Sequence, residues 1–205
     1  MKNLIALICF LFLLAQASAL KAQDYTYLYV NYNPAFTVGE AKDWTDEFSW
    51  RGFSADLRIS INGGLTAGLY SGWTVFREES DGLVTEELET DESITRFTAK
   101  QYYFLNQLPL LATVHYHWGS FGEIRPYVGL GTGVYWTNRA LEMGLYRVIQ
   151  KETHFGIAPM AGISVPLNRD TNFNLSGIYN YAFKTGDIPS VSSVGINVGI
   201  GWRFY

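Results

Sequence analysis

The chain has 205 residues, of which 48% are hydrophobic, 16% aromatic and only 17% charged, and its formal net charge is -4 at pH 7. The many aromatic residues exclude a disordered chain, because disordered segments are poor in them. A nucleic-acid binder is disfavoured, since the charge is negative and no basic footprint stands out. The composition indicates a folded protein with few charged side chains.

The N-terminus has the layout of a secretory signal peptide. A short positive start precedes the apolar run Leu4–Ala15, and small residues follow it. We expect residues 1–22 to be removed, with cleavage after Ala19 or Ala22. A retained membrane anchor is the alternative, but the run is shorter than the ~20 residues that a spanning helix needs.

Cleavage changes the charge and the cysteine content. With cleavage after Ala22, loss of Lys2 and Lys21 from the 15 basic residues leaves 13 against 19 acidic ones, a net charge of -6. The single cysteine, Cys9, lies in the removed segment, so we expect no disulfide in the mature chain.

The mature chain alternates between apolar and small or polar residues with a period of two, which is typical of β-strands. Near the end, Val194, Ile196 and Val198 share one face, and Ser193 and Asn197 share the other. In the first strand, tyrosines on both sides leave the two faces undistinguished. The predicted strands cover residues 25–32, 53–60, 65–78, 108–118, 127–137, 154–166, 172–183 and 193–204.

Connectors of two lengths separate these strands. Short ones at 62–64, 119–124 and 168–170 alternate with longer ones at 34–49, 79–97, 139–152 and 185–190. Short turns at one end and long loops at the other are typical of an outer-membrane barrel with both termini in the periplasm. We therefore predict an all-β fold, an eight-stranded antiparallel up-and-down transmembrane β-barrel, over residues 23–205.

A water-soluble barrel with an apolar interior is the alternative. Its outer wall would meet water and would carry charge. The segments 127–137, 154–166, 172–183 and 191–202 contain no Asp, Glu, Lys or Arg. This favours the membrane barrel.

Tryptophans fall near the predicted strand ends, where amphipathic rings favour the membrane–water boundary. Trp50 is also near an outer end, but its parity predicts an inward side chain, and Trp44 lies in a loop. The predicted interface girdle consists of Trp73, Trp118, Trp136 and Trp202.

The sequence resembles the small OmpA/OmpW-type outer-membrane β-barrel family over the whole mature chain. The resemblance rests on the segments 108–118 and 125–133 and on an ending with Asn197, Gly199, Trp202 and Phe204, which is followed by Tyr205. These four residues resemble the signal that the barrel-assembly machinery recognises in a last strand. The family includes structural anchors, adhesins, narrow channels and a few lipid-modifying enzymes.

The resemblance implies a bacterial outer-membrane location. Its implied partners are outer-membrane lipids, lipopolysaccharide and the barrel-assembly machinery, with no nucleic acid. The chain stops at its last strand, so we expect no peptidoglycan-binding domain.

Ionisable residues of the inward face gather in the predicted periplasmic half of the lumen. The simplest interpretation is a polar plug without a specific binding function, in which Asp56 pairs with arginine because a buried charge needs a partner. An anion-attracting constriction is the alternative, and a metal site at the His-x-His pair is weakly supported because a third ligand is missing. The cluster consists of Asp56, Arg58, His115, His117, Arg125 and Arg203.

A catalytic site is not indicated, and we predict neither enzyme activity nor a cofactor or metal. A lipid-modifying enzyme of this fold would use a serine with an activated histidine. His154 and Ser164 share a face but lie ten residues apart along one strand. The loop at 79–97 is acidic, which favours a solvated loop, with divalent-cation capture as the alternative.

These observations predict a non-enzymatic barrel with a largely filled lumen and a structural or surface-interaction role through the loops 34–49, 79–97 and 139–152. The alternative is a narrow channel for small or hydrophobic solutes, as in OmpW-type proteins.

Overall fold

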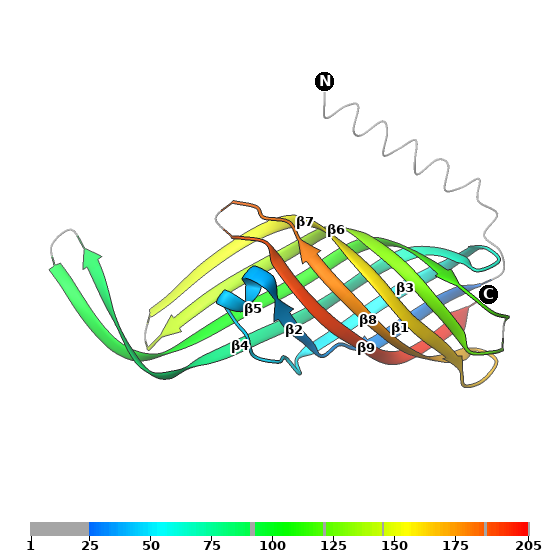
Figure 1. Ribbon diagram of the computed structural model, residues 1–205, viewed down its shortest axis with the longest axis horizontal. Coiled ribbons are helices and arrows are strands. Elements are labelled where there is room, and N and C mark those ends of the chain that lie inside the picture. The colour runs from blue at the N-terminus through cyan, green and yellow to red at the C-terminus, as the bar shows by residue number, and fades with distance from the viewer. Residues whose placement is uncertain (1–24, 91–92, 121, 145, 187, 205) are drawn as a thin grey trace, which may run out of the picture.

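The structure, a computed structural model, describes residues 25–90, 93–120, 122–144, 146–186 and 188–204. The predicted signal peptide therefore lies outside the described residues. The described chain forms one antiparallel sheet that curls into a barrel (Figure 1). Its elements are β1 (Thr26–Tyr32), β2 (Ala35–Val38), the 3₁₀ helix η1 (Gly39–Asp43), β3 (Gly52–Asn62), β4 (Leu65–Thr90), β5 (Ser93–His117), β6 (Arg125–Met143), β7 (Tyr146–Pro166), β8 (Thr171–Ala182) and β9 (Val191–Phe204).

The ring has eight strand positions, as the sequence predicted, although nine strands are described. From β3 to β9, each strand pairs with the next along the chain, and β1 pairs with both β3 and β9. The short β2 also pairs with β9, just beyond β1. Asn33 and Pro34 separate the two, so β1 and β2 are one interrupted strand. Proline has no N–H to donate, which explains the interruption.

The wall remains connected at this interruption. Asn33 donates its backbone N–H to the carbonyl of Gly52, and Ala35 and Ser49 exchange two backbone hydrogen bonds of 2.8–2.9 Å. The Pro34 carbonyl accepts from Ile196 in β9. Residues 49–52 therefore fill the place beside β2 that β3 does not reach.

Two of the predicted long loops are instead strand hairpins. In the 79–97 segment, β4 continues to Thr90 and β5 begins at Ser93, and in the 139–152 segment, β6 continues to Met143 and β7 begins at Tyr146. The prediction ended each strand at the membrane boundary. A hairpin satisfies its backbone hydrogen bonds in water as well, and residues such as Val84, Thr85 and Ile94 favour strands.

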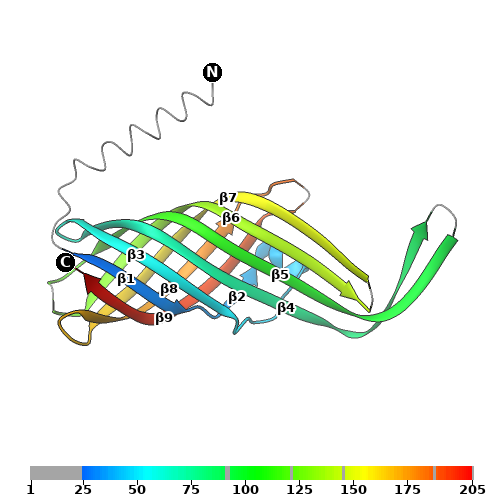
Figure 2. The same ribbon diagram turned by 180° about the vertical axis from the view of Figure 1, so that it is seen from behind.

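The β4–β5 hairpin projects beyond the ring (Figure 2). The last pair between β5 and β6 is Gln101 with Met143. Beyond it, the two strands of the hairpin pair with each other as far as Thr90 and Ser93. This projection lies at the end of the barrel opposite the short turns.

The 34–49 segment is also not a free loop. Ala35 and Thr37 of β2 and Ala41 of η1 are buried, and the ring of Trp44 packs against the same cluster. The indole N–H of Trp44 donates to the carbonyl of Phe104, 3.1 Å away. The segment therefore covers the mouth of the barrel on the hairpin side.

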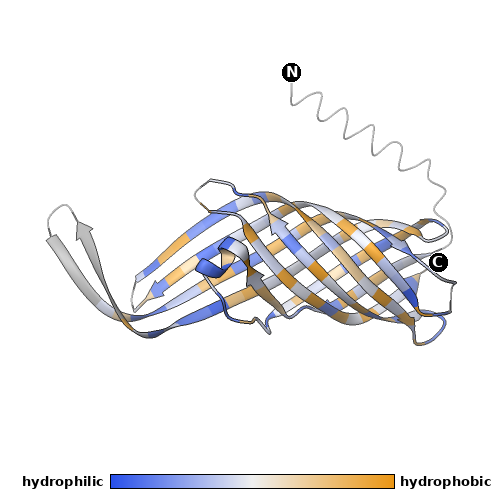
Figure 3. Ribbon diagram, in the orientation of Figure 1, coloured by the Kyte–Doolittle hydropathy of each residue, from blue (hydrophilic) through white to orange (hydrophobic). Residues whose placement is uncertain are grey.

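The exposed outer face of the wall is mainly apolar and the buried inner face is rich in small or polar side chains, as the alternation predicted. Hydrophobic and hydrophilic residues alternate along the strands (Figure 3). In β1, whose faces the sequence left open, Tyr27 and Tyr29 point inward and Val30 and Tyr32 outward. Trp50 contradicts its predicted inward direction, because 69% of its surface is exposed. It precedes β3, so the parity of that strand does not apply to it. Within the described residues, no helix is long and apolar enough to cross a membrane.

Candidate functional site

An ion pair lies at the centre of the predicted lumen cluster. Asp56 and Arg58 are neighbours on the inward face of β3, and both are 2% exposed. The Nε and Nη2 atoms of Arg58 donate to Asp56 Oδ2 at 2.8 and 2.7 Å. Burial makes such a pair costly to separate, because either charge alone would lie unpaired away from water.

Two tyrosine rings hold the guanidinium of Arg58 between them. Its Cζ atom is 4.6 Å from the ring centroid of Tyr29 and 4.3 Å from that of Tyr127. Arg58 Nη2 also donates to the hydroxyl of Tyr127 at 3.0 Å. The arginine thus joins β3 to β1 and β6 across the lumen.

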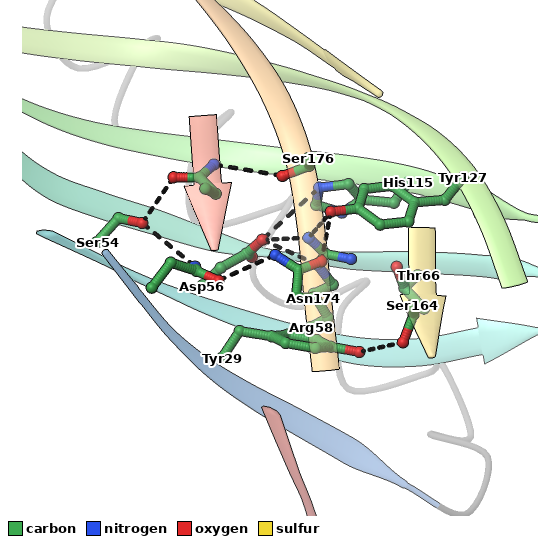
Figure 4. A network of polar contacts seen from close by, with 12 residues as sticks. Tyr29, Ser54, Asp56, Arg58, Thr66, His115, Tyr127, Ser164, Asn174 and Ser176 are labelled. Atoms are coloured by element: carbon green, nitrogen blue, oxygen red, sulfur yellow. Dashed lines mark hydrogen bonds and ion pairs between the residues drawn. The ribbon is translucent and has the colours of Figure 1, made fainter. Parts of the chain in front are cut away.

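A chain of hydrogen bonds continues from this point through residues that the predicted cluster did not include (Figure 4). Tyr127 donates to Asn174 Oδ1 at 2.8 Å, and Asn174 Nδ2 donates to Asn31 at 2.9 Å. Asn31 then donates to Ser54 at 3.2 Å, and Ser54 donates to Asn197 at 3.1 Å. Their inward parity was the available signal, but parity does not say which residues across the lumen meet.

The two histidines lie near the ion pair, and each has a polar neighbour. His115 Nε2 is 3.9 Å from Asp56 Oδ2, and His117 Nε2 is 3.5 Å from Thr66 Oγ1. Among the described residues, no three metal-ligating side chains of His, Cys, Asp or Glu come together.

The remaining predicted residues lie nearer the short turns. Arg125 and His117 line a cavity of about 240 Å³ together with Arg203. Arg203 Nη2 lies 3.3 Å from Asp170 Oδ1. The structure therefore divides the predicted cluster into two parts. Asp56 and Arg58 form a buried pair, and Arg125 and Arg203 lie nearer the short turns.

The other half of the lumen contains an apolar layer, which the sequence did not predict, together with buried polar side chains such as Gln107, Arg139 and His154. Phe76, Leu105, Leu111 and Tyr135 have no exposed surface. Side chains that lined a water-filled channel would be exposed, so this layer is packed. The buried cluster consists of Ala35, Ala41, Tyr70, Phe76, Leu105, Leu111, Tyr135, Ala158, Met160, Ile178, Ala182, Ile188 and Val191.

The four predicted girdle tryptophans all face outward, and each is 42–46% exposed. The backbone N–H of Trp118 bonds to Pro126, which places it level with the start of β6, while Trp136 lies ten residues along that strand. At a rise of about 3.3 Å per residue and a tilt of about 40°, the two rings are separated by about 25 Å along the barrel axis. The apolar band of an outer-membrane barrel has about this height.

The residues that resemble an assembly signal divide between the two faces of β9. Trp202 and Phe204 are exposed on the outer wall, and Asn197 is buried in the lumen network. A Cβ atom on Gly199 would lie 2.1 Å from the carbonyl oxygen of Val30. Asn197 and Gly199 thus have structural roles in the finished barrel, and recognition by the assembly machinery stays a prediction.

The residues considered for catalysis have other partners. His154 Nδ1 bonds to the carbonyl oxygen of Phe183 at 2.7 Å, and the Ser164 hydroxyl lies 3.3 Å from that of Tyr29. In the described structure, His154 therefore contacts a backbone carbonyl, and Ser164 contacts Tyr29.

A closed antiparallel ring, an apolar outer wall bounded by tryptophans and a polar lumen define an integral outer-membrane β-barrel protein. The chain belongs to the outer membrane protein β-barrel domain family, whose model matches residues 5–204. Its location is the bacterial outer membrane. No curated protein matches the chain.

Solved structures share this fold at low sequence identity. Neisserial surface protein A is 16% identical over 89% of this chain and 100% of that chain, with a TM-score of 0.53. Ail, the attachment invasion locus protein of Yersinia pestis, is 13% identical over 88% and 98%, and OprG from Pseudomonas aeruginosa is 13% identical over 88% and 96%, both with a TM-score of 0.51. At sequence identities this low, the similarity supports a shared fold only.

Proposed function

We propose that this protein is a non-conducting, non-enzymatic outer-membrane barrel that carries a surface hairpin for interaction outside the cell. The observation that carries the proposal is the packing of the lumen. The Asp56–Arg58 pair and its hydrogen-bonded neighbours block one part of the lumen, and the buried layer around Leu111 and Tyr135 blocks another part.

The mouth and the wall support the same function. The 34–49 segment covers the mouth, and residues 49–52 bridge the interruption between β1 and β2. A lateral exit for hydrophobic solutes would need an opening at such a site. The backbone hydrogen bonds of Asn33, Ala35 and Ser49 disfavour this second function.

Single-channel recording of the refolded protein in planar bilayers tests the closed lumen. We expect no steady conductance. A steady conductance that Arg58→Trp abolishes would overturn the proposal, because it would place the ion path through the lumen. The matched control is Arg147→Trp on β7, because the Arg147 side chain is exposed and pairs with Glu142 of β6.

The projecting hairpin provides the interaction surface. Between Glu78 and Glu92 the sequence carries eight acidic residues and no basic one. Ail has been solved in complex with the heparin analogue sucrose octasulfate. An acidic hairpin would repel such a polyanion, so we propose a cationic partner for this chain.

Binding to immobilised polylysine and to heparin tests this part of the function. We expect salt-sensitive retention on polylysine and none on heparin. Replacement of residues 81–99 by Asn-Gly should abolish the retention. Retention that survives this deletion, or preferential binding to heparin, would contradict a role of the hairpin as a cation-binding surface.

A further inference from the structure

A cavity lies at the end of the lumen that carries the short turns, which in an outer-membrane barrel is the periplasmic end. It has a volume of about 240 Å³. Its floor includes Tyr29 and Ser164, which are 1% and 5% exposed and whose hydroxyl groups contact each other. Its rim includes Glu123 and Arg169, which are exposed. The cavity therefore opens at the short turns and ends at the lumen network.

The lumen network closes the cavity on its inner side. The ring of Tyr29 stacks on the guanidinium of Arg58, with 4.6 Å between the Arg58 Cζ atom and the ring centroid. Arg58 is in turn held by hydrogen bonds to Asp56 and Tyr127. A solute that enters from the periplasm therefore meets packed side chains, and the cavity suits binding better than passage.

Three arginines from different parts of the chain line this cavity. Arg125 is the first residue of β6, Arg203 is the last but one of β9, and Arg169 lies in the turn between β7 and β8. Arg125 is 8% exposed, and the side chain of Arg203 is 14% exposed. Charges that are shielded from water in this way act more strongly on an ion in the cavity than exposed charges do.

Two carboxylates oppose these cations, and both lie toward the solvent. Glu123 is the acidic residue among the described residues that line the cavity, and it is exposed. Asp170 Oδ1 lies 3.3 Å from Arg203 Nη2, and the Asp170 side chain is 55% exposed. Three arginines against two carboxylates leave a formal charge of +1, and the more buried charges are positive. The electrostatic potential in the cavity therefore favours an anion.

Neutral polar groups beside the arginines add hydrogen-bond donors. Tyr27, Thr66 and Asn172 contribute two hydroxyl groups and an amide to the lining. An oxyanion accepts several hydrogen bonds at once, and a guanidinium donates pairs of them in a geometry that matches phosphate and carboxylate. Pockets for drug-sized molecules usually measure about 300–1,000 Å³. This cavity therefore suits a smaller anionic solute.

We propose that this cavity binds a small periplasmic solute through a phosphate or carboxylate group. Arg125 and Arg203 hold the oxyanion in the cavity, and Arg169 at the rim attracts it from solution. Glu123 opposes binding through its negative charge. Because the Asp56–Arg58 pair closes the lumen beyond the site, the solute returns to the periplasm. This binding activity is separate from the surface role of the hairpin.

Calorimetric titration of the refolded protein in a non-ionic detergent at low ionic strength tests the site. The probes are inorganic phosphate, glucose 6-phosphate and citrate. We expect saturable binding that Arg125→Gln weakens about tenfold, because a charge-assisted hydrogen bond is lost. Arg125→Lys keeps the charge and should retain part of the affinity. Tighter binding of glucose 6-phosphate than of citrate would assign a phosphate ester as the ligand, and the reverse order would assign a carboxylate; either order supports the site.

Two further variants separate a binding effect from a folding defect. Glu123→Gln removes the opposing charge at the rim and should strengthen binding about two- to fourfold, the scale of an exposed charge interaction. A variant that folds poorly would not gain affinity. Arg147→Gln is the matched control, because the exposed Arg147 pairs with Glu142 in the hairpin of β6 and β7, at the opposite end of the barrel.

Three outcomes would overturn the proposal. The first is the absence of saturable binding for all three probes. The second is equal affinity of the wild type, Arg125→Gln and Glu123→Gln, which would place the anion elsewhere. The third is equal weakening by Arg147→Gln, which would indicate a general effect of net charge. A steady conductance in bilayers would contradict the closed lumen and leave the anion site in place, so the two proposals fail separately.

Discussion

Gly129 lies directly against the imidazole of His115, its cross-strand partner on β5: a Cβ atom on Gly129 would be 2.3 Å from His115 Cδ2. Gly201 has the same relation to Tyr29 on β1, where a Cβ atom would be 2.3 Å from the ring. Inward glycines thus make room for bulky lumen side chains on the neighbouring strand, an arrangement that also covers the bare glycine backbone.

Gly129→Ala should therefore destabilise the barrel. The added methyl group would push the fully buried His115 into a packed lumen, at a cost of about 1–3 kcal/mol in the free energy of unfolding. Urea unfolding in micelles, followed by tryptophan fluorescence, measures this. Gly177→Ala is the control, because no atom lies within 4 Å of its added Cβ and the residue is exposed. Equal stability of both variants would contradict this prediction, because it would show that the side chains around His115 rearrange to accommodate the added methyl group.

Arg58→Met should destabilise the protein more strongly. It leaves the Asp56 carboxylate buried without its main partner, and breaking a buried pair typically costs about 3–5 kcal/mol. The double variant Asp56→Leu with Arg58→Met should regain part of the loss, since no lone charge remains. Unfolding free energies of the single and double variants form the measurement. A double variant less stable than Arg58→Met would show that Asp56 is stabilised by its other neighbours.

Shortening the projecting hairpin should leave the barrel equally stable. Beyond the pair of Gln101 with Met143, the described residues of β4 and β5 pair with each other and with no third strand. Their ladder there adds little to the stability of the ring, because local structure with few tertiary contacts unfolds independently. Replacement of residues 81–99 by Asn-Gly should keep the urea midpoint within experimental error. A lower midpoint would mean that the hairpin supports the wall.

The link between Glu40 and Ser190 should depend on pH. The Ser190 hydroxyl and backbone N–H donate to Glu40 Oε2 at 2.6 and 3.1 Å, and these bonds lower the pKa of Glu40 below its ordinary value of 4.5. Because the folded-state pKa is depressed, the link contributes fully above the unfolded pKa and is lost as the pH falls through the folded one. Carboxyl NMR shifts of Glu40 measure this, and Ser190→Ala should return the pKa toward 4.5.

The sequence predicted the ring, its outward face and the inward direction of Asp56 and His115. In a membrane wall, every second residue of a strand faces lipid and is apolar, so the alternation in the sequence also gives the direction of each side chain. The prediction was wrong in segments that do not face lipid. Outside the membrane, alternation no longer marks where a strand ends, so the sequence predicts loops at 79–97 and 139–152 where the structure has strands. The contact of Tyr127 with Asn174 depends on packing across the lumen, which no pattern along one strand contains.

The pairing of β1 with β9 joins residues near the two ends of the described chain. The pairings from β3 to β9 connect neighbours in the chain and can form early as local hairpins. The ring cannot close until Phe204 has been synthesised and exported, because Thr26 pairs with it. Until then, two strand edges lie open to aggregation. The lifetime of that open sheet sets the interval during which the growing protein needs protection.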